Sequence, residues 1–347
     1  MKNAIRIKNW QLLRVSGREE LCDLRDENFV TVGKHAFLGK RRLETVILPS
    51  GVSAVKTEAF RGCRRLKQVT LPAENIIGIS GAAFAGCGRL HYVENGEMIS
   101  LIGTRAFAGC RTLQNMNFGR DLRKIGDDAF RGCRAMTELT LPSSLQTVGK
   151  SAFAHCSELA RVEMEYGLTS LSRGIFRGCI SLTEIEWAET VKSIPHDAFR
   201  DCSAFTSFTI PSCVEKVGKR AFMGCTRLAE VTLELGVTQI GARAFARTPR
   251  LVSAVLPHTL KRIGFGAFGL GVSKNKTVLY VDNEYMCRRL RWKLVLCGSA
   301  GRVRVEQIGK TIEERKRERH RTTIEQTPVH LFDQKERIEA KDADEST

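Results

Sequence analysis

The chain has 347 residues, of which 42% are hydrophobic and 27% are charged, and its formal net charge at pH 7 is +17. No uninterrupted apolar run approaches the roughly 18 residues that are needed to cross a bilayer, so the sequence predicts no transmembrane helix. The composition is that of a basic chain with enough apolar residues to build a large core.

Residues 1–28 are expected to form an N-terminal cap. The opening stretch MKNAIRIKNWQLLRV mixes basic and apolar residues and lacks the continuous apolar segment of a signal peptide. This favours a cytoplasmic or nuclear protein. The alternative is an exported protein whose signal segment lies upstream of the given sequence.

Residues 29–273 are internally repetitive, with an anchoring Phe every 23 residues except for one step of 24 before Phe84. An aliphatic residue always stands five positions before this Phe, and an apolar residue stands six positions after it in ten of the eleven copies. The anchors are Phe37, Phe60, Phe84, Phe107, Phe130, Phe153, Phe176, Phe199, Phe222, Phe245 and Phe268. These positions must be buried in almost every copy.

Each repeat also carries a short stretch in which apolar and polar residues alternate, such as TELTLP at 137–142. A period of two predicts a short strand with one buried side, and the Pro that often follows should end it. The AFxGC stretch that precedes the strand is expected to be a compact turn or a single helical turn. Each coil is therefore predicted to contribute one strand.

One such unit cannot bury its apolar side alone, but stacked copies share a continuous core. The predicted fold is an α/β repeat solenoid with about eleven coils of 23 residues. Each coil has one short parallel strand, with a turn or short helix on the other side. At a strand spacing of about 4.8 Å, eleven coils form a rod roughly 50 Å long.

The repeated string, aliphatic-Gly-x-x-Ala-Phe-x-Gly-Cys-x-x-Leu-x-x-Val-x-Leu-Pro, resembles the BspA-type leucine-rich repeat over about residues 29–273. The resemblance implies a leucine-rich-repeat solenoid that works by binding proteins, and in some bacterial members by adhesion at the cell surface.

Eight of the twelve cysteines stand three residues after a repeat Phe, so their spacing belongs to the repeat. Neighbouring coils would separate their Cβ atoms by about 5 Å, which is wider than the roughly 3.5–4.5 Å of a disulfide. They are expected to be small buried hydrophobic residues. Cys22, Cys213, Cys287 and Cys297 have no C-x-x-C partner, and no zinc site is predicted.

The positive charge lies on the repeats, because residues 301–347 contain eleven Lys and Arg and eleven Asp and Glu. Many arginines stand one, four or five residues after the repeat Phe, where they should align as a basic stripe along the turns. A candidate polyanion-binding edge consists of Arg61, Arg64, Arg65, Arg131, Arg134, Arg177 and Arg200. Such a stripe is more often a solvated edge than a nucleic-acid site.

The outward positions of the strands, eight and ten residues after the Phe, are neutral to acidic. A candidate patch for a protein partner consists of Tyr92, Glu94, Asn115, Asn117, Glu138, Thr140, Arg161, Glu163, Glu184 and Glu186. Trp187 occupies an inward position and is expected to contribute to packing.

After the repeats, residues 274–300 are expected to form a C-terminal cap. Val278 and Tyr280 should continue a strand, and Met286, Leu290 and Leu294 lie four apart on one helical face. Residues 301–347 are predicted to be a charged tail that is helical or disordered. Within it, residues 315–321 resemble a nuclear localisation signal that Glu318 interrupts.

No catalytic site is predicted. The chain contains no phosphate-binding Gly-rich loop and no H-E-x-x-H motif, and its seven His residues stand at unrelated repeat positions. We therefore expect a protein without enzymatic activity, cofactor or metal.

The sequence favours a scaffold or recognition module that binds a partner protein through its strands. Two alternatives stay open at this point. One is binding of RNA, DNA or acidic membrane by the arginine edge, and the other is surface adhesion if an export signal is missing from the sequence.

Overall fold

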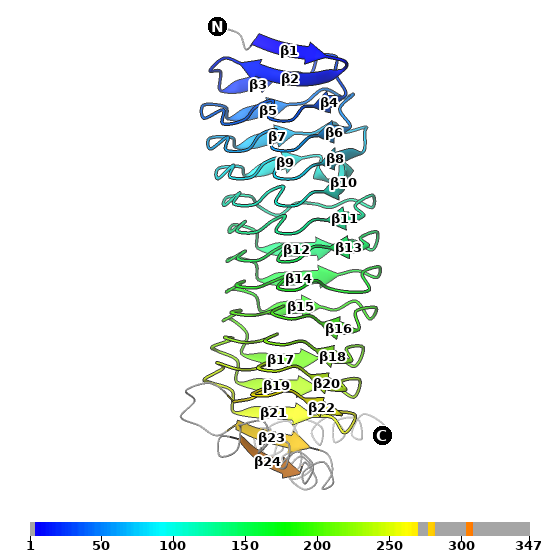
Figure 1. Cartoon of the computed structure of the whole chain (residues 1–347), viewed down its shortest axis with the longest axis vertical. Helices are drawn as coiled ribbons and strands as arrows, with labels where there is room; N and C mark the ends of the chain where they lie inside the picture. Colours follow the sequence, from blue (N-terminus) through cyan, green and yellow to red (C-terminus); the bar gives the residue numbers. More distant parts are fainter. Residues whose placement is uncertain (1–3, 270–276, 282–302, 308–347) are drawn as a thin grey trace, which may run out of the picture.

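The computed structural model describes residues 4–269, 277–281 and 303–307, which form a rod of stacked coils with β1 (Ala4–Lys8) at one end and β24 (Val303–Gln307) at the other (Figure 1). The described residues contain 24 short strands and one 3-10 turn, η1 (Gly96–Met98), but no α-helix. The chain is thus a β-solenoid of about eleven coils, in which the repeats have the turn and not the short helix that was the other possibility, and the α/β description is not confirmed.

One column of strands contains the alternating stretches that the sequence analysis identified, and we call its outward surface the strand face. It is divided into three parallel sheets. The first contains β3 (Leu21–Asp23), β5 (Thr45–Ile47), β7 (Gln68–Thr70) and β9 (Tyr92–Glu94), and the second contains β12 (Glu138–Leu141), β14 (Arg161–Met164) and β15 (Glu184–Glu186). The third contains β17 (Ser207–Ile210), β19 (Glu230–Leu233), β21 (Ser253–Leu256), β23 (Thr277–Val281) and β24 (Val303–Gln307).

The structure contains a second column of strands that was not predicted. Most coils therefore contain two strands instead of one. The second column begins with β1 (Ala4–Lys8), β2 (Gln11–Ser16), β4 (Thr31–Val32), β6 (Ala54–Val55), β8 (Ile77–Ile79), β10 (Ile99–Ile102), β11 (Lys124–Ile125) and β13 (Thr147–Val148), and continues with β16 (Ser193–Ile194), β18 (Lys216–Val217), β20 (Gln239–Ile240) and β22 (Arg262–Ile263). From β4 onward, these strands hold the aliphatic residue that stands five positions before the Phe in ten of the eleven coils, and Leu171 is the exception. Most of these strands have two residues, which is too short for an alternation to be recognised.

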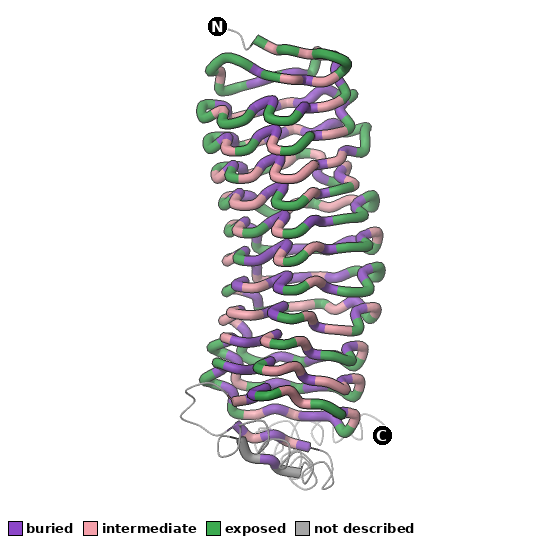
Figure 2. The backbone as a smooth tube through the Cα atoms, viewed as in Figure 1, coloured by how far each residue is buried: buried purple, intermediate pink, exposed green. Residues whose placement is uncertain are grey.

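The core is a set of ladders in which each coil stacks the same residue on its neighbour, so burial recurs at the same place in every turn of the tube (Figure 2). Consecutive repeat Phe rings from Phe37 to Phe268 are stacked, with centroids 4.4–6.0 Å apart. This spacing is close to that of neighbouring strands in a sheet. The Phe side chains therefore pack in register with the backbone hydrogen bonds.

The AFxGC stretch forms a turn instead of a helix because two of its residues have left-handed backbone conformations. The residue two positions before the Phe has φ between 53° and 64° in all eleven coils, although it is Gly in only two of them. The residue two positions after the Phe, usually Gly, is also left-handed, as at Gly62 with φ 72°. A helix cannot continue through such residues.

The turns satisfy their backbone groups by bonding to the next coil. Phe60 N–H donates to the carbonyl of Ala83 at 2.7 Å. The peptide bond that joins Ala83 to Phe84 then donates in its turn, because Phe84 N–H bonds to the carbonyl of Ala106 at 2.7 Å. Equivalent bonds start two residues before and two residues after the Phe, as in Asp128 to Lys150 and Gly86 to Ala108, both at 2.8 Å. Three columns of peptide groups thus run along the turns, with every N–H pointing toward the C-terminal end.

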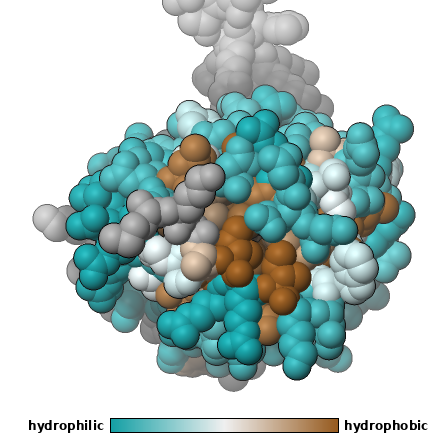
Figure 3. Space-filling view, turned by 90° about the horizontal axis from the view of Figure 1, so that it is seen from above, coloured by the Kyte–Doolittle hydropathy of each residue, from teal (hydrophilic) through white to brown (hydrophobic). Residues whose placement is uncertain are grey.

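At the N-terminal end, β1 pairs antiparallel with β2, and Val15 N–H donates to the carbonyl of Ala36 in the first turn. Seen from this end, an apolar area is surrounded by hydrophilic side chains (Figure 3). The outermost strand, β1, contributes the half-buried Ile5 and Ile7. These residues cover part of the first coil.

At the other end, β23 pairs parallel with both β21 and β24. Residues 303–307 were predicted to belong to a helical or disordered tail. The structure corrects this prediction, because they form strand β24. Its sequence, VRVEQ, contains a period of two that the highly charged surroundings obscured. The helix predicted around Met286, Leu290 and Leu294, the nuclear localisation signal and the rest of the tail lie outside the described residues.

Candidate interaction surfaces

The structure distributes the predicted partner-binding residues over the first two sheets of the strand face. Tyr92 and Glu94 lie on β9, Glu138 and Thr140 on β12, Arg161 and Glu163 on β14, and Glu184 and Glu186 on β15. Asn115 and Asn117 lie between the two sheets, in a coil that has no strand at this position. The predicted patch is therefore two surfaces with a gap between them.

Asn115 has a structural role in this gap. Its Oδ1 accepts hydrogen bonds from the backbone N–H groups of Thr137 at 2.9 Å and Glu138 at 3.1 Å. The side chain thereby replaces the strand that is missing from its coil. In the same coil, Phe118 packs edge-on against Phe130 with centroids 5.7 Å apart.

The second sheet presents an acidic surface, which we call the β12–β15 patch, formed by Glu138, Thr140, Arg161, Glu163, Glu184 and Glu186. Arg161 Nη1 lies 3.8 Å from Glu184 Oε2, and Arg161 Nη2 donates to Glu186. Glu184 and Glu186 remain 66% and 54% exposed. The patch contains four carboxylates and one guanidinium, so it carries a net negative charge in a basic protein.

On the first sheet, Glu94 is held by its neighbours, because Gln68 Nε2 and Thr70 Oγ1 each donate to its carboxylate at 2.5 Å. Tyr92 is 54% exposed, and its ring lies beside that of His91 with centroids 6.1 Å apart.

The turns form a second surface, the turn edge, in which several predicted arginines are paired with acids. Arg61 lies 2.5 Å from Glu58 and Arg131 lies 3.3 Å from Asp128, in each case three residues earlier in the same turn. Glu58 and Asp128 were not part of the predicted edge, because they stand before the Phe and the predicted arginines stand after it. An i, i+3 search would have found them.

Asp197 is the most enclosed of these acids, with a side chain that is 5% exposed. It accepts from Arg220 Nε at 2.8 Å and Nη2 at 2.9 Å and from Arg173 Nε at 3.1 Å, and Arg200 Nη1 lies 3.7 Å away. Burial alone would raise the pKa of Asp197, but the hydrogen bonds and charges of Arg220 and Arg173 outweigh it and lower the pKa.

A neighbouring acid, Asp201, lies 3.4 Å from Arg200 Nε and 3.9 Å from Arg177 Nε. Arg177 and Arg200, both predicted for polyanion binding, thus face acids of their own chain. Their Nε atoms are buried without a hydrogen-bond partner among the described residues. In contrast, Arg64, Arg65 and Arg134 form no ion pair within the part of the chain that the structure describes.

The repeat cysteines form a buried ladder, and all ten described cysteines are free thiols. Each repeat Cys donates its S–H to the carbonyl of the Phe in the preceding coil, with Sγ to O distances of 3.0–3.3 Å. Burial raises the pKa of Cys156 to about 12, and it also raises the pKa of Cys133. The expectation of small buried residues is confirmed, and the hydrogen bond was not foreseen.

Across residues 4–269, 277–281 and 303–307, His, Cys, Asp and Glu side chains form no group of three that could hold a metal ion. No helix in these ranges is long and apolar enough to cross a membrane.

Comparison with known proteins places the repeats in a family. No curated protein matched the chain. Among solved structures, it is similar to leucine-rich repeat proteins from Bacteroides ovatus (18% identity, 89% of this chain and 99% of that chain, TM-score 0.49) and Eubacterium ventriosum (18%, 80% and 68%, TM-score 0.49). It is also similar to the leucine-rich repeat protein TpLRR of T. pallidum (26%, 65% and 87%, TM-score 0.42).

The profile of the BspA type leucine rich repeat region (6 copies) matches residues 30–160 and 146–273. These residues include all eleven repeat Phe and both strand columns of the repeats. The chain belongs to the BspA-type leucine-rich repeat family.

Proposed function

We propose that the protein is a non-enzymatic recognition module that binds a partner protein through the β12–β15 patch. One observation carries this proposal. The outward residues of three adjacent parallel strands are exposed, or half-buried at Glu163, and differ from coil to coil, whereas the inward residues are apolar throughout. The repeat thus provides a rigid support, and the variable residues provide selectivity.

The charge of the patch indicates the chemistry of the partner. The patch contains four carboxylates, two of which pair with Arg161, while the chain as a whole is strongly basic, so a partner with a basic surface is attracted to this patch and repelled elsewhere. Complementary charge guides encounter and discriminates against wrong partners more than it adds affinity. The ion pairs of Arg161 hold the charged groups in place before binding.

The proposal is tested by charge reversal on the patch. Tagged protein is used to capture partners from a nuclease-treated lysate at moderate salt, with wild type compared with Glu138→Lys/Glu163→Lys/Glu184→Lys. We expect the captured partner to bind the variant at least about tenfold more weakly, which corresponds to about 1.4 kcal/mol. Thermal unfolding should be nearly unchanged because Glu138 and Glu184 are exposed, and Glu163 is half-buried with only a long hydrogen bond from Thr140 at 3.4 Å.

A matched control carries the same change in net charge away from the patch. Glu74, Asp121 and Glu215 are exposed and lie before the strands of the second column. Glu74→Lys/Asp121→Lys/Glu215→Lys should capture the partner as wild type does. Equal capture by wild type and the patch variant would place the binding surface elsewhere on the solenoid.

A further inference from the structure

The unpaired arginines of the turn edge are concentrated in the first five coils. Four or five residues after the Phe, these coils carry Arg41, Arg42, Arg64, Arg65, Arg89, Arg111 and Arg134, which we call the basic track. The sixth coil has Ser157 and Glu158 at these positions. All seven arginines are exposed, and the described residues form no ion pair with any of them.

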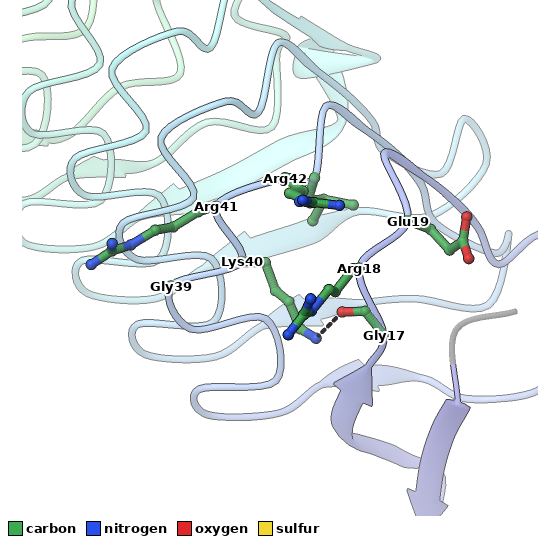
Figure 4. Close-up of a pocket in the computed structure, with 8 residues that line it drawn as sticks. Gly17, Arg18, Glu19, Gly39, Lys40, Arg41 and Arg42 are labelled. Carbon is green, nitrogen blue, oxygen red and sulfur yellow. Dashed lines mark hydrogen bonds between the residues drawn. The ribbon is translucent and has the colours of Figure 1, made fainter. Parts of the chain in front are cut away.

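The N-terminal end of the basic track opens into a cavity of about 270 Å³ between residues 17–19 and 39–43. Arg18, Lys40, Arg41 and Arg42 line it (Figure 4). Lys40 stands where most coils have Cys, and its Nζ donates to the carbonyl of Gly17 at 2.9 Å. Two separate segments thus bring four cations to one hollow, whose lining contains a single acid, Glu19.

The cavity has a net positive charge even when the negative groups around it are included. The carbonyl ends of the three peptide columns face this end of the rod, and aligned peptides give an end charge of at most about −0.5 per column. Together with Glu19, they offset less than three of the four positive charges. The remaining charge favours an anionic group in the cavity.

The track favours a flexible linear ligand. The Phe rings of its five coils are 4.4–5.2 Å apart, so its arginines are repeated at this interval along a straight rod. A straight row of arginines can contact successive anionic groups along a single extended chain. It can contact few phosphates of a nucleic-acid duplex, because the duplex backbone is helical and turns away from the row. No aromatic side chain stands at the track positions, whereas binding of single-stranded nucleic acid relies on stacked bases.

We propose that the basic track and its cavity bind a linear sulfated polysaccharide. Arginine presents paired N–H donors that match the oxygens of a sulfate group. Leu38, 49% exposed and adjacent to the cavity residue Gly39, offers apolar contact to a sugar ring. A polyphosphate chain has no group that would use this contact. The site lies on the turn edge and is separate from the β12–β15 patch.

The test measures binding of a heparin-derived octasaccharide to the full chain by calorimetry at 50 and 150 mM salt. Wild type is compared with a track variant, Arg64→Ala/Arg65→Ala/Arg89→Ala, and with a cavity variant, Arg41→Ala/Arg42→Ala. We expect each variant to bind at least tenfold more weakly and to show a smaller dependence on salt. Exposed arginines can be removed without loss of folding, which thermal unfolding checks.

The matched control removes three exposed arginines from the C-terminal half of the same edge, as Arg227→Ala/Arg247→Ala/Arg250→Ala. It should bind within twofold of wild type. Equal weakening by the control and the track variant would overturn the location. Tighter binding of single-stranded DNA, duplex DNA or polyphosphate than of the octasaccharide would overturn the ligand class.

The two proposed surfaces can be distinguished in the same assay. Glu138→Lys/Glu163→Lys/Glu184→Lys should retain octasaccharide binding, because the substitutions lie on the strand face. A loss of binding in this variant would show that the octasaccharide does not use the turn edge alone, and would overturn the proposal.

Discussion

Asp197 accepts a hydrogen bond at 2.8 Å from Nε of Arg220, the residue that occupies the same position one coil later. Arg173, from the preceding coil, donates to the other carboxylate oxygen at 3.1 Å. The enclosed carboxylate therefore links three consecutive coils through their side chains, in addition to the backbone bonds between the turns.

The first prediction is that Asp197→Asn lowers the free energy of unfolding by about 2 kcal/mol, since hydrogen bonds to a buried charged group are lost. Thermal unfolding measures the change. Asp128→Asn, which removes a single exposed ion pair with Arg131, should cost less than about 0.5 kcal/mol. Equal effects of the two variants would contradict the special role of Asp197.

The same carboxylate gives a prediction for pH. The pKa of Asp197 is lower in the folded protein than in the unfolded chain, so its stabilising effect is complete above the ordinary Asp pKa of about 4. The effect is lost as the pH falls through the folded pKa. Unfolding temperatures of wild type and Asp197→Asn should therefore differ at pH 6, and the difference should begin to shrink below about pH 4 and disappear as the pH falls through the folded pKa. A constant difference down to pH 2 would be the contrary result.

The Phe ladder predicts a sharp contrast between neighbouring residues. Phe130 is fully buried between Phe107 and Phe153, so Phe130→Ala should cost about 3–5 kcal/mol. Arg131 is exposed, and Arg131→Ala should cost less than about 0.5 kcal/mol. Thermal unfolding compares the two, and similar losses would show that the faces are wrongly assigned.

Substituting Ala for two of the left-handed glycines is expected to destabilise the protein by different amounts. A Cβ at Gly62 would meet open space, so Gly62→Ala should cost about 1 kcal/mol from backbone strain alone. At Gly178, a Cβ would lie 2.5 Å from Nδ1 of His155, whose side chain covers this glycine from the preceding coil. Gly178→Ala should therefore lower the unfolding temperature more, and His155→Ala should remove the difference.

The buried thiols predict selective labelling. Cys213 is the one half-buried cysteine among the ten described, whereas burial raises the pKa of Cys156 to about 12. Cys287 and Cys297 lie outside the described residues and are replaced by Ser in the test protein. Mass spectrometry after brief treatment with a thiol reagent should find one label, at Cys213. Rapid labelling of Cys156 in the folded protein would contradict the buried ladder.

The sequence predicts the parts of this fold that depend on one coil. Phe130, the aliphatic Ile125 five residues before it and the alternation of β12 follow from a period that is visible in the printed chain. The two-residue strands were missed because they form through pairing with the next coil, as Ile125 does with Val148.

The candidate surfaces were predicted less completely for the same reason. Glu138 and Glu184 were correctly placed on the strand face, but the position of Asn115 in a gap depends on bonds to residues 22 and 23 positions away. The left-handed conformation of Glu58 has no signal in residue type, since Glu rarely adopts it. The bonds from coil to coil impose it.

The three peptide columns along the turns make the number of coils adjustable. From the turn of Phe84 to that of Phe222, each turn accepts three backbone hydrogen bonds from the coil before it and donates three to the coil after it, so removing or duplicating one of these coils leaves no turn amide without a partner. The single 24-residue step shows where variation is tolerated: its extra residue lies in the segment between Leu71 and Ile77, and the turn at Phe84 stays in register with its neighbours. Gene duplication in units of one repeat can therefore lengthen the protein while its recognition surfaces diverge.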